Sequence, residues 1–321
     1  SIIAVGASNE LGTGDFASLT SYGLKDSIIC AFDKATGQMK WMKSYGSEKH
    51  DMFNVIKTEG ESLIVGGSYE QNTSLYKLDG NGNIIWRARL SDADFEVEDV
   101  LALEDKYIVI ASNYMFSVSL DGQLIKKQRF PVLFRGLVKT ASGFTAVGST
   151  ESEVNLADFI YLLPENTTDT SVYKNHGSMD GFIALFDDDA QILDFRFWGG
   201  EGADGFYGAV AAADGNGIVA VGYAGFSSFG NGALEDHDAV SVKANGVAVR
   251  FDGLTPKYAK VFANTETSDT YLYRVTGYGS GYAIIGTDKS TDDPSENEVF
   301  ERVKGTDAIV LFFDDASKGF N

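Results

Sequence analysis

The stretch Asp180-Gly181-Phe182-Ile183-Ala184-Leu185-Phe186-Asp187 decides the fold, because it is a short apolar run closed by an aromatic residue and Asp, and the chain repeats it. Closures by Phe or Leu followed by Asp occur six times: Phe32-Asp33, Leu78-Asp79, Leu120-Asp121, Phe186-Asp187, Phe251-Asp252 and Phe313-Asp314. Each is preceded by an apolar run that ends in Gly or Ala, at 2–6, 63–67, 107–111, 144–148, 218–222 and 282–286. We name the earlier run strand B and the later run strand C. Two short apolar runs in a fixed order indicate a repeat built from β-strands.

Two further runs complete the repeat. Strand A precedes strand B at 53–58, 97–103, 134–140, 206–213 and 271–276, and strand D follows strand C at 39–41, 84–86, 124–125, 192–195 and 258–262. The turn between strands C and D is rich in Asp, Asn and Gly, which suit hairpin turns. The periods from Leu63 to Tyr107 and from Tyr107 to Phe144 are 44 and 37 residues, close to the roughly 40–45 residues of one propeller blade.

We therefore predict an all-β fold, with residues 1–321 forming a single β-propeller domain of six four-stranded antiparallel blades. The first blade lacks strand A and the last lacks strand D, so the sequence shows 22 strands, two short of six full blades. Either flanking residues are missing from this chain or the terminal blades are thinner. Seven blades, with incomplete terminal blades, is the alternative.

The stretch 180–187 also resembles the repeat of a known family. It is followed by Gly199-Gly200-Glu201-Gly202-Ala203-Asp204 and then by Ile218-Val219-Ala220-Val221-Gly222. This order resembles the bacterial "seven-bladed β-propeller" type repeat, whose units read roughly D-A-F-V-x-K-F-D, a turn, a Trp-containing strand, G-G, D and a Val-Gly strand. Trp stands at the expected place at Trp41 and Trp86. The resemblance implies a propeller that is often exported or displayed on a bacterial surface, and it implies no activity.

Charge and composition narrow the classes of partner. A formal net charge of −20 disfavours nucleic acid, because phosphate binding requires clustered Lys and Arg. No segment approaches the roughly 20 consecutive apolar residues that would cross a bilayer. The single cysteine, Cys30, lies in an apolar run and is expected to be a small buried residue. We expect a monomer without membrane insertion, located outside the cell or on its surface.

Long connections between strands B and C are predicted to carry function. They span residues 7–25, 149–179, 223–244 and 287–306, and alternation of strand direction places all four on one face of a propeller. Long loops on a rigid scaffold commonly bind or catalyse, although neutral drift at a permissive site is the alternative. Within one insert, Leu156, Phe159, Ile160 and Leu163 have helical spacing before Pro164, which predicts a short amphipathic helix.

Candidate ligand-binding residues are aromatic side chains of these inserts, which offer stacking surface: Phe16, Tyr22, Tyr161, Tyr173, Tyr223, Phe226 and Phe229. Candidate metal ligands precede strand A and should surround the mouth of a central channel: Asp51, Asp94, Asp204 and Asp269. Such carboxylates suit calcium, but an Asp before a strand more often accepts hydrogen bonds within its own turn. His50, His176 and His237 fall on the same predicted face, where a transition-metal site is a further alternative.

Two functions remain open on the sequence. The first is a non-catalytic binding or scaffolding module that contacts protein or carbohydrate through the insert-bearing face, without a required cofactor. The second is a glycan-active enzyme that uses two carboxylates on that face. The sequence contains no G-x-S-x-G, H-E-x-x-H or P-loop motif, which favours the binding module.

Overall fold

A computed structural model describes residues 1–150, 156–164, 167–263, 265–290 and 305–314. The contacts divide the chain into two compact units, residues 1–130 and 131–321, here called unit 1 and unit 2. The described residues form 22 strands in six antiparallel sheets, and their helical segments are all short 3₁₀ turns. The prediction of an all-β, six-bladed β-propeller fold is confirmed. That the two units form one domain stays a prediction.

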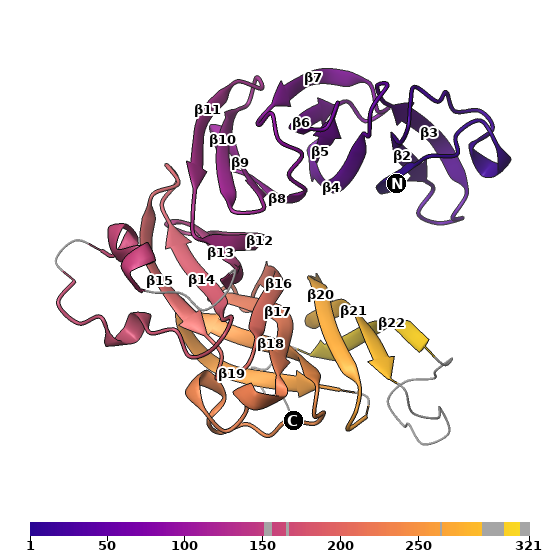
Figure 1. The fold of residues 1–321 in the computed structure, drawn as a ribbon. Coiled ribbons are helices and arrows are strands. Elements are labelled where there is room, and N and C mark those ends of the chain that lie inside the picture. Colours follow the sequence, from indigo (N-terminus) through magenta and orange to yellow (C-terminus); the bar gives the residue numbers. More distant parts are fainter. Residues whose placement is uncertain (151–155, 165–166, 264, 291–304, 315–321) are drawn as a thin grey trace. The chain divides into compact units, whose positions relative to one another are not determined.

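Unit 1 contains three sheets (Figure 1). The first comprises β1 (Ile2–Ser8), β2 (Asp26–Phe32) and β3 (Met39–Tyr45). The second comprises β4 (Met52–Glu59), β5 (Ser62–Tyr69), β6 (Asn72–Leu78) and β7 (Ile84–Arg89). The third comprises β8 (Val97–Ala102), β9 (Lys106–Ala111), β10 (Tyr114–Ser119) and β11 (Leu124–Arg129). The missing strand A of the first sheet agrees with the sequence pattern.

Unit 2 contains the other three sheets. The fourth comprises β12 (Val132–Thr140), β13 (Gly143–Thr150), β14 (Gly181–Phe186) and β15 (Ile192–Trp198). The fifth comprises β16 (Asp204–Ala211), β17 (Ile218–Gly225), β18 (Ala244–Asp252) and β19 (Thr255–Phe262). The sixth comprises β20 (Asp269–Tyr278), β21 (Gly281–Ser290) and β22 (Gly305–Asp314). Within the unit, the A strands β12, β16 and β20 lie in succession against one another.

Alternation of side chains along each strand forms the core between neighbouring sheets. In unit 2, Ile183 and Trp198 of the fourth sheet pack with Val247, Val249 and Phe251 of the fifth. Successive strand residues point to opposite faces, so the intervening residues of β14 and β15 face away from the fifth sheet. Strand β14 is buried on both faces, which explains its continuous apolar run.

All five A strands in the described part of the chain contain a β-bulge, a feature that the sequence pattern did not predict. The register against strand B shifts by one residue in β4, β8, β12, β16 and β20. The extra residues at these shifts are Asn54, Glu98, Arg135, Tyr207 and Tyr273. A bulge leaves one residue outside the ladder and redirects its side chain, so these five positions are equivalent across the repeats.

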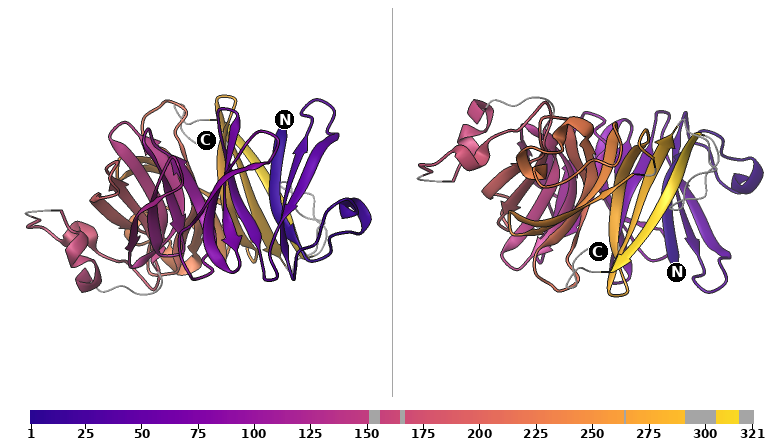
Figure 2. Two further views of the ribbon diagram at one scale, coloured as in Figure 1. Left: turned by 90° about the horizontal axis from the view of Figure 1, so that it is seen from above. Right: turned by 90° about the horizontal axis from the view of Figure 1, so that it is seen from below.

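The long connections differ from the tight ones in the same sheets. Where strands B and C are linked tightly, as at Glu70 and Gln71 or at Ser112, the backbone adopts positive φ. The long connection between β13 and β14 contains the 3₁₀ turns η2 (Leu156–Leu162) and η3 (Ser171–Tyr173), which project at the end of the fourth sheet (Figure 2). The connections β1–β2 and β17–β18 contain η1 (Gly14–Phe16), and η4 (Phe226–Ser228) with η5 (Gly232–Leu234). Residues 291–304 of the fourth insert lie outside the described residues.

The predicted amphipathic helix is present, but its type and its buried face differ from the prediction. Segment η2 is a 3₁₀ turn rather than an α-helix, so residues three apart share a face. Phe159 and Leu162 are buried, whereas Ile160 is 66% exposed. The grouping of Ile160 with Phe159 was wrong because it assumed 3.6 residues per turn.

Candidate functional site

Asp51, one of the four candidate metal ligands, is buried and closes a turn in unit 1. Its Oδ2 accepts hydrogen bonds from the backbone N–H and the hydroxyl of Ser47, each at 2.7 Å. Its Oδ1 accepts a third from the backbone N–H of Glu70, also at 2.7 Å. The carboxylate thus ties the turn before β4 to the end of β5.

Asp204 repeats this arrangement in unit 2. Its Oδ2 accepts hydrogen bonds from the Gly200 N–H at 2.9 Å and from the Ser228 hydroxyl at 2.8 Å, while its Oδ1 accepts a longer one of 3.3 Å from the Gly225 N–H. Gly225 ends β17 as Glu70 follows β5. Both carboxylates therefore act as caps within their own turns, as is common for Asp.

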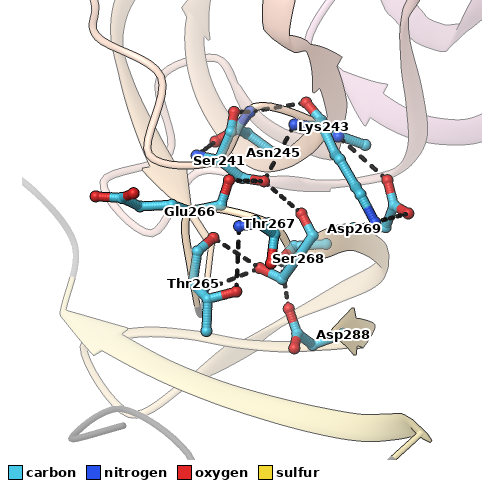
Figure 3. Close-up of polar contacts among 11 residues, drawn as sticks. Ser241, Lys243, Asn245, Thr265, Glu266, Thr267, Ser268, Asp269 and Asp288 are labelled. Carbon is cyan, nitrogen blue, oxygen red and sulfur yellow. Dashed lines mark hydrogen bonds and ion pairs between the residues drawn. The ribbon is translucent and has the colours of Figure 1, made fainter. Parts of the chain in front are cut away.

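The other two candidates have different surroundings. Asp94 is exposed. Asp269 is half-buried beside the end of the β17–β18 connection (Figure 3), where it accepts a hydrogen bond of 3.3 Å from the Ala244 N–H and lies 3.9 Å from Lys243 Nζ. Among the described residues, no three His, Cys, Asp or Glu side chains are placed to hold a metal ion together. A ring of these four carboxylates and calcium binding stay predictions.

A second set of caps stands before strand C. Asp26, Asp180 and Asn245 each accept a hydrogen bond from the backbone N–H four residues earlier, namely Tyr22, His176 and Ser241. The last of these is visible in Figure 3, where the Ser241 hydroxyl also donates to the Ser268 carbonyl at 2.6 Å. Because an amide performs the task at Asn245, a negative charge is not required for it. These buried acids are explained by turn closure.

Burial nevertheless perturbs Asp204 strongly. Desolvation, with a smaller contribution from the charge of Asp180, raises the pKa of Asp204 from 3.8 to about 7, while its hydrogen bonds from Gly200 and Ser228 oppose the rise. The folded protein therefore keeps this proton at pH values where the unfolded chain has lost it. Stability contributed by Asp204 is present below pH 4 and is lost as the pH rises through about 7.

We expect Asp204→Asn to remove this pH dependence. Asparagine does not titrate and Asn245 shows that an amide suits such a cap. The stability of the variant relative to the wild type, measured as the difference in unfolding free energy by urea denaturation, should therefore increase as the pH rises from about 4 to about 8. Asp94→Asn is the matched control, because Asp94 is exposed. A constant difference between Asp204→Asn and the wild type over this range would show that Asp204 has an ordinary pKa.

The predicted aromatic residues separate into exposed and buried sets. Tyr22, Tyr161 and Phe226 are 48%, 65% and 52% exposed, so their rings are accessible to solvent. Phe16 is half-buried against Leu11, Leu19 and Ile28.

Three further candidates pack within unit 2. Phe229 packs against the core between the fourth and fifth sheets. Tyr173 is buried against Phe195, and its hydroxyl donates to Asp194 at 2.8 Å. Tyr223 stacks on Tyr207. Tyr173 and Phe229 thus anchor their inserts.

The Gly-rich turn between β15 and β16 contacts one of the inserts, the β17–β18 connection. Gly199 accepts a hydrogen bond from the Ala233 N–H at 2.8 Å, and the Glu201 N–H donates to Asn231 Oδ1 at 2.8 Å. A Cβ at Gly200 would lie 2.2 Å from the Ser228 carbonyl oxygen. The glycine therefore permits the β17–β18 connection to lie directly on this turn. The sequence indicated a Gly-rich turn here, but it did not predict that the β17–β18 connection packs against this turn.

Residues of two inserts and two sheets line an open pocket of about 360 Å³ in unit 2. We call it the insert pocket, and its lining residues are Val172, His176, Ile183, Arg196, Phe197, Trp198, Gly232, Ala233, Phe251, Leu254, Thr255 and Pro256. Val172 and His176 belong to the predicted insert 149–179, and Gly232 and Ala233 to the insert 223–244. The pocket is thus largely apolar with a few polar groups, the usual composition of ligand sites. None of the seven predicted aromatic residues lines it.

The polar groups of the insert pocket are held by local contacts. Arg196 Nη1 donates to Asp194 Oδ1 at 2.6 Å, and its guanidinium lies 4.8 Å from the Tyr173 ring. The His176 ring is partly exposed, and its Nδ1 lies 3.5 Å from Asp180 Oδ2. A cationic guanidinium and an imidazole beside an apolar floor suit a ligand group that joins an apolar body to a hydrogen-bond acceptor.

Comparison with known proteins gives similarity at the level of the fold alone. No family model matches the sequence, and no curated protein matches it. The chain is similar to the WD40 domain of Pan2 from Neurospora crassa, with 10% identity, a TM-score of 0.40, and coverage of 73% of this chain and 62% of that domain. A protein of unknown function from Bacteroides caccae shows 11% identity and a TM-score of 0.43, with coverage of 81% and 78%. BamB from Moraxella catarrhalis shows 12% identity and a TM-score of 0.37, with coverage of 90% and 79%.

Proposed function

We propose that this protein is a non-catalytic binding or scaffolding propeller, exported or displayed on a bacterial surface, whose inserts contact a protein or carbohydrate partner. The observation that carries the proposal is the insert pocket, because two of the long connections and two sheets converge on it. Its volume lies within the usual range for ligand sites of about 300–1,000 Å³. Among the described residues, no helix is long and apolar enough to cross a membrane.

The composition of the pocket favours a partner protein that inserts an apolar side chain. Val172, Leu254 and Pro256 supply accessible apolar surface, and burial of a large apolar side chain contributes about 1.5–3 kcal/mol. Arg196 and His176 supply polar groups at the same pocket. A hydrophobic side chain followed by a carbonyl or carboxylate is the simplest group that satisfies both.

The alternative of a glycan-active enzyme needs two carboxylates at an open site. Asp180 and Asp204 interact electrostatically, but both are buried, both cap turns, and neither lines the insert pocket. This pair therefore favours the binding function.

Filling the pocket should block binding. A displayed peptide library selected on the protein would supply ligands, and Ala233→Phe places a ring in the pocket without removing a core side chain. We expect at least a tenfold loss of affinity for the selected peptides, since roughly 1.4 kcal/mol of lost burial suffices. Val240→Phe is the control, because Val240 belongs to the same insert, is 47% exposed and does not line the pocket. Equal affinity of both variants and the wild type would place binding elsewhere.

A further inference from the structure

Four tyrosines of unit 2 pack into one cluster, which we call the tyrosine patch: Tyr207, Tyr223, Tyr271 and Tyr273. The ring centroids of Tyr207 lie 5.5 Å from Tyr223 and 5.2 Å from Tyr273. Those of Tyr271 lie 5.1 Å from Tyr223 and 6.5 Å from Tyr273. Each ring thus contacts two others, and the four form a continuous aromatic surface.

The patch is built by the bulges of neighbouring A strands. Tyr207 is the bulge residue of β16 and Tyr273 is that of β20. The equivalent residue of β12 is Arg135, whose guanidinium lies 6.0 Å from the Tyr207 ring. Because β12, β16 and β20 lie in succession, the three redirected side chains form a row. The same type of β-bulge thus occurs in three neighbouring strands and directs three side chains to one surface.

The patch is both accessible and rigid. Tyr273 is 37% exposed, and the other three rings are half-buried. Arg274 Nη1 donates to the backbone carbonyls of Tyr207 at 2.5 Å and Tyr273 at 3.1 Å, which joins the two bulges. Rings held on strands lose little conformational entropy on binding, so the surface is preorganised.

The chemistry of the patch differs from that of the adjacent core. The residues immediately before the bulges of β12 and β16 are Phe134 and Phe206, and both are fully buried. The patch uses tyrosine throughout, so every ring combines an apolar face with a hydroxyl that can donate or accept. The guanidinium groups of Arg135 and Arg274 lie at its border, where Arg135 faces the Tyr207 ring and Arg274 donates to backbone carbonyls. Such a surface suits a ligand that has apolar C–H faces and a rim of hydroxyl groups.

We propose that the tyrosine patch binds a neutral glycan, with pyranose rings stacked on Tyr207 and Tyr273. The net charge of −20 favours a neutral glycan over an acidic one. No residue of the patch lines the insert pocket. The patch is therefore a second site, and the inference goes beyond the proposed binding of a partner at the insert pocket.

Affinity electrophoresis and titration calorimetry test the proposal on the full chain. The probes are soluble cellulose, starch and mannan derivatives with their neutral oligosaccharides, and polygalacturonate as the acidic comparison. We expect at least one neutral glycan to bind and polygalacturonate not to bind. Tyr207→Leu/Tyr273→Leu should lower the affinity roughly tenfold, the effect of losing stacked aromatic contacts. Tyr161→Leu is the matched control, because Tyr161 is 65% exposed and lies outside the patch.

The outcomes separate this site from the insert pocket. Ala233→Phe should bind the glycan as the wild type does. Absence of binding to all three neutral glycans would overturn the proposal, as would equal binding by a double variant whose circular dichroism and melting temperature match the wild type. Loss of a selected peptide, rather than a glycan, in the same double variant would overturn it and assign the patch to a protein partner.

Discussion

Asp204→Ala is expected to destabilise unit 2 by about 3–5 kcal/mol at pH 6. The substitution leaves the Gly200 N–H and the Ser228 hydroxyl without their acceptor in a buried turn, and each buried donor left unsatisfied costs about 1–3 kcal/mol. It also leaves a cavity beside the Gly-rich turn against which the β17–β18 connection packs. Gly225 is less affected, because its N–H also donates to the Ala203 carbonyl. Urea denaturation followed by circular dichroism measures the change in unfolding free energy.

Asp94→Ala is the matched control for this prediction. Asp94 occupies the corresponding place in the sequence before a strand A but is exposed, so its loss should change stability by less than about 0.5 kcal/mol. Asp51→Ala repeats the test in unit 1, where three hydrogen bonds of 2.7 Å are lost. Similar small effects of all three substitutions would contradict the capping role assigned to the buried carboxylates.

The repeat in the sequence predicted the strands because each run has the same chemistry. Apolar residues closed by Phe or Leu and Asp mark the end of strand C, and in the structure Asp33, Asp79 and Asp187 accept hydrogen bonds from N–H groups two residues later in the following turn. The half-buried Asp33 carboxylate also has its pKa lowered to about 2 by Lys40 and by backbone N–H groups. Local sequence is sufficient for such turns, because donor and acceptor lie within a few residues.

The site could be predicted only in part, because its residues meet through tertiary contacts. Two of the predicted inserts contribute residues to the pocket. Which aromatic residue is buried could not be inferred, as Tyr173 and Tyr161 show with 4% and 65% exposure in the same insert. The bulges at Tyr207 and Tyr273 depend on the register between strands, which a single sequence does not specify. Two of the bulges share a sequence pattern that could have indicated them. Phe206-Tyr207-Gly208 and Phe134-Arg135-Gly136 both have the bulge residue between Phe and Gly.

Phe159→Ala is expected to release the insert between β13 and β14 from its sheet. Phe159 is fully buried and is the ring through which η2 contacts the face of the fourth sheet directed away from the fifth. Its centroid lies 5.0 Å from Phe197, 5.7 Å from Phe195 and 6.3 Å from Phe182.

Truncation of a buried Phe to Ala costs about 3–5 kcal/mol. We expect this cost to weaken the free energy with which the insert docks on its sheet. The population of the undocked insert should therefore rise on the order of a hundredfold or more, which limited proteolysis detects as faster cleavage within residues 156–173. Ile160→Ala is the neighbouring control, because Ile160 is 66% exposed and should change the cleavage rate little. Equal cleavage of Phe159→Ala and the wild type would mean that Phe159 does not hold the insert. Faster cleavage together with weaker binding of peptides selected on the insert pocket would link the docking of η2 to the side of that pocket formed by Val172 and His176.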